Sequence, residues 1–160
     1  MMKPKIRPMT SKDKPAIMQI LQVTPEFTLG EVAVAEEVLD SYLNDTSGSG
    51  YHVLVAEVNS SVVGYICYGP TPLTKGTWDL YWAAVAPQKQ GHGIGRALFA
   101  LAERKIKEAQ GRLALIETST KPEYERTRRF HYSQGYQLAC RIADFYAPGD
   151  DKLIFQKRLS

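Results

Sequence analysis

The sequence predicts an α/β fold: one domain built on a mixed, mostly antiparallel central sheet with helices on both faces. Three observations support this prediction. Segments with helical spacing of apolar residues alternate with apolar runs of strand length. One such run, Leu80–Ala86, is followed directly by a glycine-rich turn and an amphipathic helix. The chain has 160 residues, enough for one sizeable core, and shows no repeat or linker, so residues 1–160 are expected to form a single domain.

The N-terminal part is expected to form a short strand over Lys5–Met9 and two helices. Thr10 or Ser11 can cap the first helix, because a side-chain oxygen accepts from the free N–H groups of the first turn. The Thr24–Pro25 pair interrupts its apolar periodicity. Apolar residues at helical spacing predict the second helix over Leu29–Leu43.

The middle of the chain reads as strands. Tyr51–Glu57 and Val62–Tyr68 are joined by the polar turn Asn59–Ser61, as in a hairpin. A third strand is expected over Thr77–Ala86, and Pro87 ends it because proline cannot donate to a sheet ladder.

The C-terminal part continues with a helix after the glycine-rich turn, for which Gly111 is the expected C-cap. The remaining elements are a strand over Leu113–Thr118, a helix over Glu123–Gln134, and strands over Tyr136–Phe145 and Lys152–Leu159. The order strand–helix–helix–strand–strand–strand–helix–strand–helix–strand–strand gives one mixed sheet.

The glycine-rich turn is the strongest functional signal in the chain. Gly91, Gly93 and Gly95 stand between a buried strand and the start of a helix. Such a turn presents free backbone N–H groups to a phosphate, and Arg96 adds a cation. It is not a Walker A loop, since no Lys-Ser/Thr pair follows the glycines. It also lacks the third glycine of a dinucleotide-binding fingerprint, which makes another nucleotide ligand a remote alternative.

Composition limits the other functional classes. The net charge of +3 gives no argument for nucleic-acid binding. No apolar run approaches the length of a membrane span, and Met1–Lys5 lacks the apolar core of a signal peptide. Cys67 and Cys140 lie in apolar runs and are expected to be buried free thiols, which suits a cytoplasmic protein. No Cys/His spacing indicates a metal site.

The run Gln90-Gly91-His92-Gly93-Ile94-Gly95 resembles the coenzyme A loop of the GNAT N-acetyltransferase superfamily, Gln/Arg-x-x-Gly-x-Gly/Ala. The preceding Ala84-Val85-Ala86-Pro87 resembles the strand end usual in that family. The resemblance extends over nearly the whole chain and has the same order of elements.

The resemblance implies an acetyl-CoA-dependent N-acetyltransferase. The acceptor would be the primary amine of a small molecule, an amino acid or a peptide, which attacks the thioester directly. The alternative is an acyl-CoA binding module or sensor of the same fold with little or no turnover. A longer acyl-CoA is also compatible with this loop, and the family's habit makes a homodimer an expected assembly. No metal is needed for this chemistry.

By the family pattern, the strand 80–86 splays from its neighbour at a bulge. The pantetheine arm then pairs with the exposed backbone of Ala83, Ala84 and Val85, much as an added strand would. The pyrophosphate lies on the N–H groups at the positive end of the helix dipole. The residues implied there are Gln90, Gly91, His92, Gly93, Ile94, Gly95 and Arg96.

Two proton transfers are needed, because an ammonium must lose a proton and the departing thiolate must gain one. Asp79 matches the glutamate base of the histone acetyltransferase branch, and strand alternation would place it on one face with Tyr81 and Ala83. The alternative is a solvated or turn-capping Asp79. Glu117 is a second carboxylate, for which a structural hydrogen bond is the simpler role.

The helix before Gly135 departs from the family, whose Tyr four residues before the glycine protonates the thiolate. Here that position is His131. His131 can replace the tyrosine, as an ordinary pKa of about 6.5 permits; it can be a structural histidine; Tyr132 can reach in through a shifted helix; or water can serve. Tyr124 stands where the family usually has an asparagine that contacts the cofactor.

Aromatic residues give a weaker signal for the acceptor pocket. Phe27, Trp78, Tyr81 and Tyr146 are the candidates to line it, although aromatic residues on a buried strand more often belong to the core. Acidic residues nearby in the last hairpin would suit a cationic amine, with turn aspartates as the plain alternative.

Overall fold

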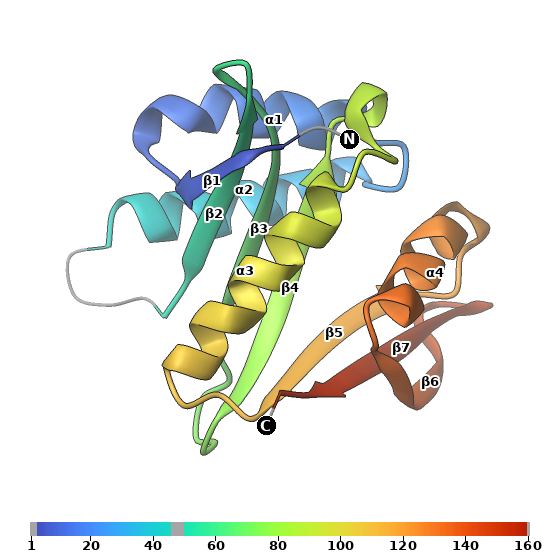
Figure 1. The fold of residues 1–160 in the computed structure, drawn as a ribbon. Helices are drawn as coiled ribbons and strands as arrows, with labels where there is room; N and C mark the ends of the chain where they lie inside the picture. Colours follow the sequence, from blue (N-terminus) through green and yellow to red (C-terminus); the bar gives the residue numbers. More distant parts are fainter. Residues whose placement is uncertain (1–2, 46–49, 160) are drawn as a thin grey trace.

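A computed structural model describes residues 3–45 and 50–159 as one seven-stranded sheet flanked by helices (Figure 1). The strand order is β1-β2-β3-β4-β5-β7-β6. The strands are β1 Lys5–Pro8, β2 His52–Val58, β3 Ser61–Pro70, β4 Thr77–Val85, β5 Leu113–Ser119, β6 Gln137–Ala147 and β7 Asp150–Arg158. Every neighbouring pair is antiparallel except β4 and β5, which confirms the mixed, mostly antiparallel sheet. Of the segment Met1–Lys5, which lacks the apolar core of a signal peptide, Met1 and Met2 lie outside the described residues.

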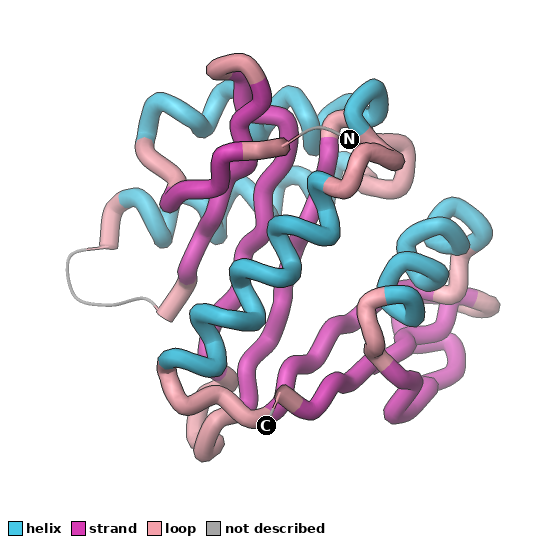
Figure 2. Tube along the Cα trace, viewed as in Figure 1, coloured by secondary structure: helices cyan, strands magenta, loops and turns pink. Residues whose placement is uncertain are grey.

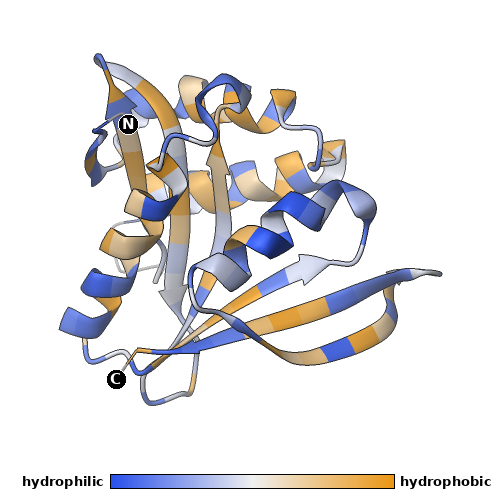
Figure 3. Cartoon of the chain, turned by 45° about the vertical axis from the view of Figure 1, so that its right-hand side comes forward, coloured by the Kyte–Doolittle hydropathy of each residue, from blue (hydrophilic) through white to orange (hydrophobic). Residues whose placement is uncertain are grey.

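Helices cover both faces of the sheet, as expected. They are α1 Lys14–Val23, α2 Leu29–Leu43, α3 Ile94–Glu108 and α4 Glu125–Ser133. Helices α1 and α2 pack on one face through Ile17, Leu21 and Leu39, and α3 packs on the other through Leu98 and Ile106. Figure 3 shows the mixed hydropathy that gives α3 one apolar face for the sheet. Within the described residues, no helix is long and apolar enough to cross a membrane.

The parallel strands β4 and β5 separate halfway along their length (Figures 1 and 2). They pair only from Thr77↔Leu113 to Leu80↔Ile116. At this point β4 also carries an extra residue, Tyr81, because Cys67 of β3 pairs with Trp82 while Tyr68 pairs with Leu80. The sheet therefore opens into a wedge between its N-terminal and C-terminal halves.

The extra residue corrects one detail of the sequence analysis. Simple alternation placed Asp79 and Ala83 on the same face of the strand. Before the bulge, Trp78 and Leu80 pack in the core under α3, whereas after it Ala83 and Val85 take that side. A bulge shifts the two-residue period by one, so Asp79 belongs to the opposite face from Ala83.

Two further expectations were wrong in detail. The left-handed residue that ends α3 is Gln110, with φ 68°, and Gly111 follows it. Gly111 donates its N–H to Ile106 O at 2.8 Å, and a Cβ at Gly111 would clash with the Ile106 side chain. Cys140 is an exposed thiol, because β6 forms the sheet edge with every residue exposed; Cys67 is buried as expected.

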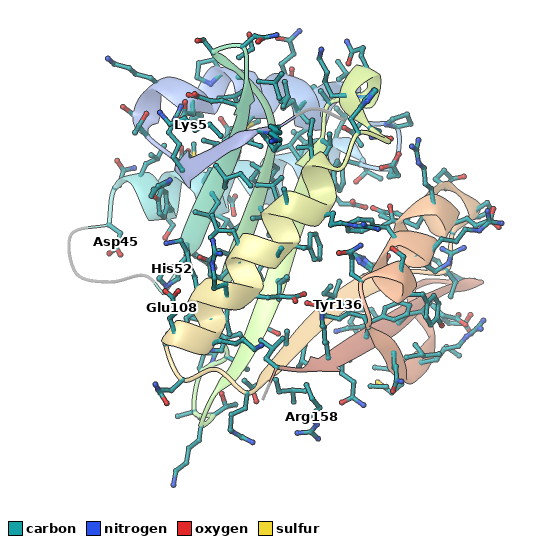
Figure 4. All side chains as sticks on the ribbon, viewed as in Figure 1. Lys5, Asp45, His52, Glu108, Tyr136 and Arg158 are labelled. Carbon is teal, nitrogen blue, oxygen red and sulfur yellow. The ribbon has the colours of Figure 1, made fainter. Side chains whose placement is uncertain are left out.

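A cluster of polar side chains joins α3 to the C-terminal half of the sheet. The Tyr136 hydroxyl, labelled in Figure 4, donates to Glu103 Oε2 on α3 at 2.8 Å. Lys157 Nζ on β7 donates to Glu103 Oε1 at 2.8 Å and to Gln134 O at 2.7 Å. Glu103 is 14% exposed, so its charge is compensated largely by these contacts.

Replacing Tyr136 by Phe should lower the free energy of unfolding by about 1–2 kcal/mol, because the hydroxyl donates to a charged carboxylate. Tyr132→Phe is the matched control, since Tyr132 is 53% exposed and should change stability by less than about 0.5 kcal/mol. Urea denaturation of both variants measures the difference. Equal stabilities for the two variants would show that the cluster contributes nothing.

Candidate active site

A cavity of about 890 Å³ lies between the end of β4, the start of α3 and helix α4. The backbone of β4 beyond the bulge forms one wall. The glycine-rich turn forms the second wall, and α4 forms the third. Among the lining residues are Ala83, Ala84, Val85, Gln90, Gly91, Gly93, Ile94, Gly95 and Arg96, all of which the sequence analysis had singled out. His92 is the exception: it is exposed and does not line the cavity.

The turn has the backbone geometry of an anion site. Gly91 and Gly93 have φ of 80° and 85°, a region that side chains with a Cβ rarely adopt. Gly93 is the N-cap of α3, and Ala97 N is the first to donate back, to Gly93 O at 3.1 Å. The N–H groups of the first turn therefore have no partner within the helix. Gln90 Nε2 donates to Val85 O at 3.0 Å, which fixes the turn against the end of β4.

Positive charge surrounds this cavity. Among the described residues, four cations line it, Lys3, Lys89, Arg96 and Arg126, against one carboxylate, Glu26. Arg126 Nη2 lies 3.9 Å from the position that a Cβ on Gly91 would occupy, so this guanidinium stands over the glycine-rich turn. Arg126 is a lining residue that the sequence did not single out. Its place in the expected helix over Glu123–Gln134 does not indicate that Arg126 faces the glycine-rich turn, 35 residues earlier in the chain.

A second cavity, of about 870 Å³, occupies the wedge between β4 and β5. Phe27, Tyr81 and Tyr146 line it, as does Asp79. Trp78 does not; it is 8% exposed and packs in the core under α3, near Tyr68 and His52. Strand alternation explains the difference, because Trp78 faces the opposite side from its neighbour Asp79, on the face that α3 covers.

The two carboxylates named from the sequence both line the second cavity. Asp79 Oδ2 accepts a hydrogen bond from Thr71 Oγ1 at 2.6 Å. Glu117 is 54% exposed and forms an ion pair with Lys152 at 3.1 Å. Asp79 is therefore oriented by a neutral hydroxyl, whereas the charge of Glu117 is already compensated.

The two cavities share the lining residues Glu26, Ala83, Phe99, Thr127 and His131. A molecule in one cavity can therefore meet a molecule in the other at this junction. His131 stands there and is 5% exposed. Burial lowers its pKa to about 4, so the imidazole is neutral at neutral pH. Its Nδ1 is buried and has no hydrogen-bond partner.

Glu26 is the carboxylate at the junction that the sequence analysis did not identify. It lies in the turn between α1 and α2, where burial raises its pKa and Arg126 opposes that shift. The sequence around Glu26 does not indicate a functional carboxylate, because the surroundings of Glu26 depend on Arg126 in α4, 100 residues later. Within residues 3–45 and 50–159, no group of three or more His, Cys, Asp or Glu side chains could hold a metal ion.

His131 should make the stability depend on pH. Its pKa is about 4 in the folded protein and near 6.5 when unfolded, so only the unfolded chain binds the proton between these values. Stability should thus fall as pH falls from 6.5 to 4, by up to about 1.4 kcal/mol per pH unit from this group. Urea denaturation of wild type and His131→Gln over this range measures the slope. Identical slopes in the two proteins would show that His131 titrates normally.

Comparison with known proteins shows which family has this architecture. The model of the acetyltransferase (GNAT) family matches residues 15–136. The crystal structure of a protein assigned to the GNAT acetyltransferases, from Desulfovibrio desulfuricans, is 38% identical, with a TM-score of 0.94 over 99% of this chain and 100% of that one. No significant match is found among curated protein sequences.

More distant structures share the fold. The ribosomal-protein-alanine N-acetyltransferase of Brucella melitensis is 26% identical over 96% of this chain and 99% of that one, with a TM-score of 0.75. The ribosomal-protein-S18-alanine N-acetyltransferase of Escherichia coli is 19% identical over 99% of this chain and 95% of that one, with a TM-score of 0.77. Together with the family match over most of the chain, the open β4–β5 wedge and the glycine-rich turn at the start of α3 identify the protein as a member of the acetyltransferase (GNAT) family.

Proposed function

We propose that the protein is an acetyl-CoA-dependent N-acetyltransferase that acetylates a primary amine by direct attack on the thioester. The junction of the two cavities carries this proposal. Ala83 and His131 line both cavities, so a donor in the first and an acceptor in the second can meet there. Acetyl-CoA, the co-substrate of this family, supplies the activated acetyl group when bound.

The first cavity fits coenzyme A. The cations Lys89, Arg96 and Arg126 and the first turn of α3 would hold its phosphates. The backbone of Ala83, Ala84 and Val85 would bind the pantetheine arm in the manner of a strand, because β5 no longer pairs with β4 there. A backbone N–H near Val85 would stabilise the oxyanion of the tetrahedral intermediate.

The proton transfers would use Asp79 and His131. Asp79 would accept the proton that the incoming ammonium must lose, directly or through water. His131 is neutral, and a neutral imidazole is a weak acid. It would therefore accept a proton from the nitrogen of the tetrahedral intermediate and then pass that proton to the departing sulfur. The bond from nitrogen to the carbonyl carbon forms and the bond from that carbon to sulfur breaks. His131 returns to its neutral form, and Asp79 releases its proton to water.

Acetyl-CoA binding tests the first part of the proposal. Saturation at about 100 times Kd should stabilise the protein by about 2.7 kcal/mol, a rise in melting temperature of about 5–11 °C, whereas NADH and ATP should give less. Arg126→Gln should raise the Kd for acetyl-CoA roughly tenfold. Arg129→Gln is the matched control on α4, since Arg129 is 78% exposed and pairs with Glu125. An absent shift with acetyl-CoA would overturn the proposed function.

Turnover tests the second part and separates an enzyme from a sensor of acyl-CoA. Free-thiol release is followed with 1,4-diaminobutane, 4-aminobutan-1-ol and a peptide with a free N-terminal alanine as acceptors. Asp79→Asn should lower kcat/KM roughly 100-fold while leaving the Kd for acetyl-CoA unchanged. If Glu117→Gln causes this loss and Asp79→Asn does not, Glu117 is the base instead. Binding of acetyl-CoA without thiol release from any acceptor would favour the sensor.

A further inference from the structure

We propose that the acceptor carries a second positive charge in addition to its reacting amine, as an aliphatic diamine or polyamine does, and that Glu31 binds this second charge. The inference rests on the proposed function and specifies the substrate class of the same site. It follows from which carboxylates of the second cavity have a cationic partner and which do not.

The second cavity is lined by more negative than positive side chains. Its described lining residues include the carboxylates Glu26, Glu31, Asp79, Glu117 and Asp150 and one cation, Lys121. Two of these carboxylates already have cationic partners. Asp150 lies 3.7 Å from Lys121 and also binds Ser119, and Glu117 lies 3.1 Å from Lys152.

Glu31 and Asp79 are in a different situation. Each accepts a hydrogen bond from a neutral hydroxyl: Glu31 Oε2 from Tyr124 at 2.8 Å, and Asp79 Oδ2 from Thr71 at 2.6 Å. Among the described residues, neither forms an ion pair. A hydroxyl orients a carboxylate without neutralising it, so both charges remain available to a cationic ligand. They come from different elements that line the cavity, Asp79 from β4 and Glu31 from the first turn of α2.

Glu31 is held in place as a binding group would be. Its N–H donates to the capping Thr28 Oγ1 at 3.1 Å, which fixes the backbone. Its carboxylate meets Tyr124, a residue 93 positions away in the C-terminal half, and this contact spans the wedge. Burial and the neighbouring carboxylate both raise the pKa of Tyr124, so its hydroxyl keeps the proton that it donates. The tyrosine at this position thus orients an acidic group toward the acceptor cavity.

Polar atoms without partners also point to a ligand in this cavity. Thr118 is 6% exposed and His131 is 5% exposed, yet Thr118 Oγ1 and His131 Nδ1 have no hydrogen-bond partner. Both residues line the cavity. Buried polar atoms are normally satisfied, so a bound polar ligand or its water would complete them. Phe27 and Tyr81 add aromatic surface for the alkyl chain or for a cation–π contact.

A matched pair of acceptors tests the proposal. 1,4-Diaminobutane and 4-aminobutan-1-ol have the same primary amine and chain length, but only the diamine has a second charge. For the wild-type protein at about 0.05 M salt, where charges are weakly screened, kcat/KM should be roughly tenfold higher for the diamine. The difference should lie mainly in KM.

The variant Glu31→Gln removes the charge and keeps an oxygen that can accept from Tyr124. It should abolish most of the diamine preference, while the Kd for acetyl-CoA stays unchanged. Glu37→Gln is the control, because Glu37 is exposed on the same helix and does not line the cavity. Its preference should equal that of wild type.

Each outcome decides the proposal. Equal kcat/KM for the two amines in wild type, or a preference that survives in Glu31→Gln, would overturn it and leave the acetyltransferase function standing. If neither amine is acetylated while the alanine peptide is, the diamine class is wrong but the function stands. Failure of the function itself would show separately, as the absence of a thermal shift with acetyl-CoA.

Discussion

The site depends on the loss of hydrogen bonding between two neighbouring strands. Only the segment from Thr77↔Leu113 to Leu80↔Ile116 joins β4 to β5. Beyond it, the extra residue Tyr81 turns β4 away, and both cavities open along the unpaired backbone. An unpaired strand inside a sheet leaves polar backbone groups unsatisfied, so this arrangement is stable only where a ligand or water can take the place of the missing neighbour.

The separated halves need other contacts to hold their relative positions. Helix α3 supplies them on one face, through Phe99 against Phe130, with ring centroids 5.1 Å apart, and through Glu103 with Tyr136 and Lys157. On the opposite face, Tyr124 and Glu31 make the corresponding contact at 2.8 Å. The wedge is thus bounded by side-chain interactions that fix its width where the sheet hydrogen bonds cannot.

Local sequence signals predicted the elements well, because periodicity and glycine content are read within one segment. The second helix lies over Leu29–Leu43 as expected, and the glycine-rich turn begins α3. The family pattern implied a bulge in this strand, but its position at Tyr81 depends on the register with β3, which no local pattern reports. The bulge reversed the side assigned to Ala83 relative to Asp79.

The same limit applies to the candidate site. Residues in the turn were found because their backbone pattern is contiguous. Arg126 and Glu26 were missed because their positions depend on contacts between distant segments. The low pKa of His131 likewise comes from tertiary burial that no neighbouring residue in the sequence indicates.

The two cavities differ in what recognises their ligands, and this has an evolutionary consequence. Under the proposed function, the first binds the donor through main-chain N–H groups, glycine conformations and the cations Lys89, Arg96 and Arg126. The second is lined by side chains from the α1–α2 turn, α2, β4, β5 and the last hairpin. If the second cavity holds the acceptor as proposed, exchanging Glu31, Phe27 or Tyr146 would alter which acceptor fits without changing a residue that lines the first cavity. Under the proposed function, acceptor choice can therefore diverge by single substitutions that leave the donor site intact.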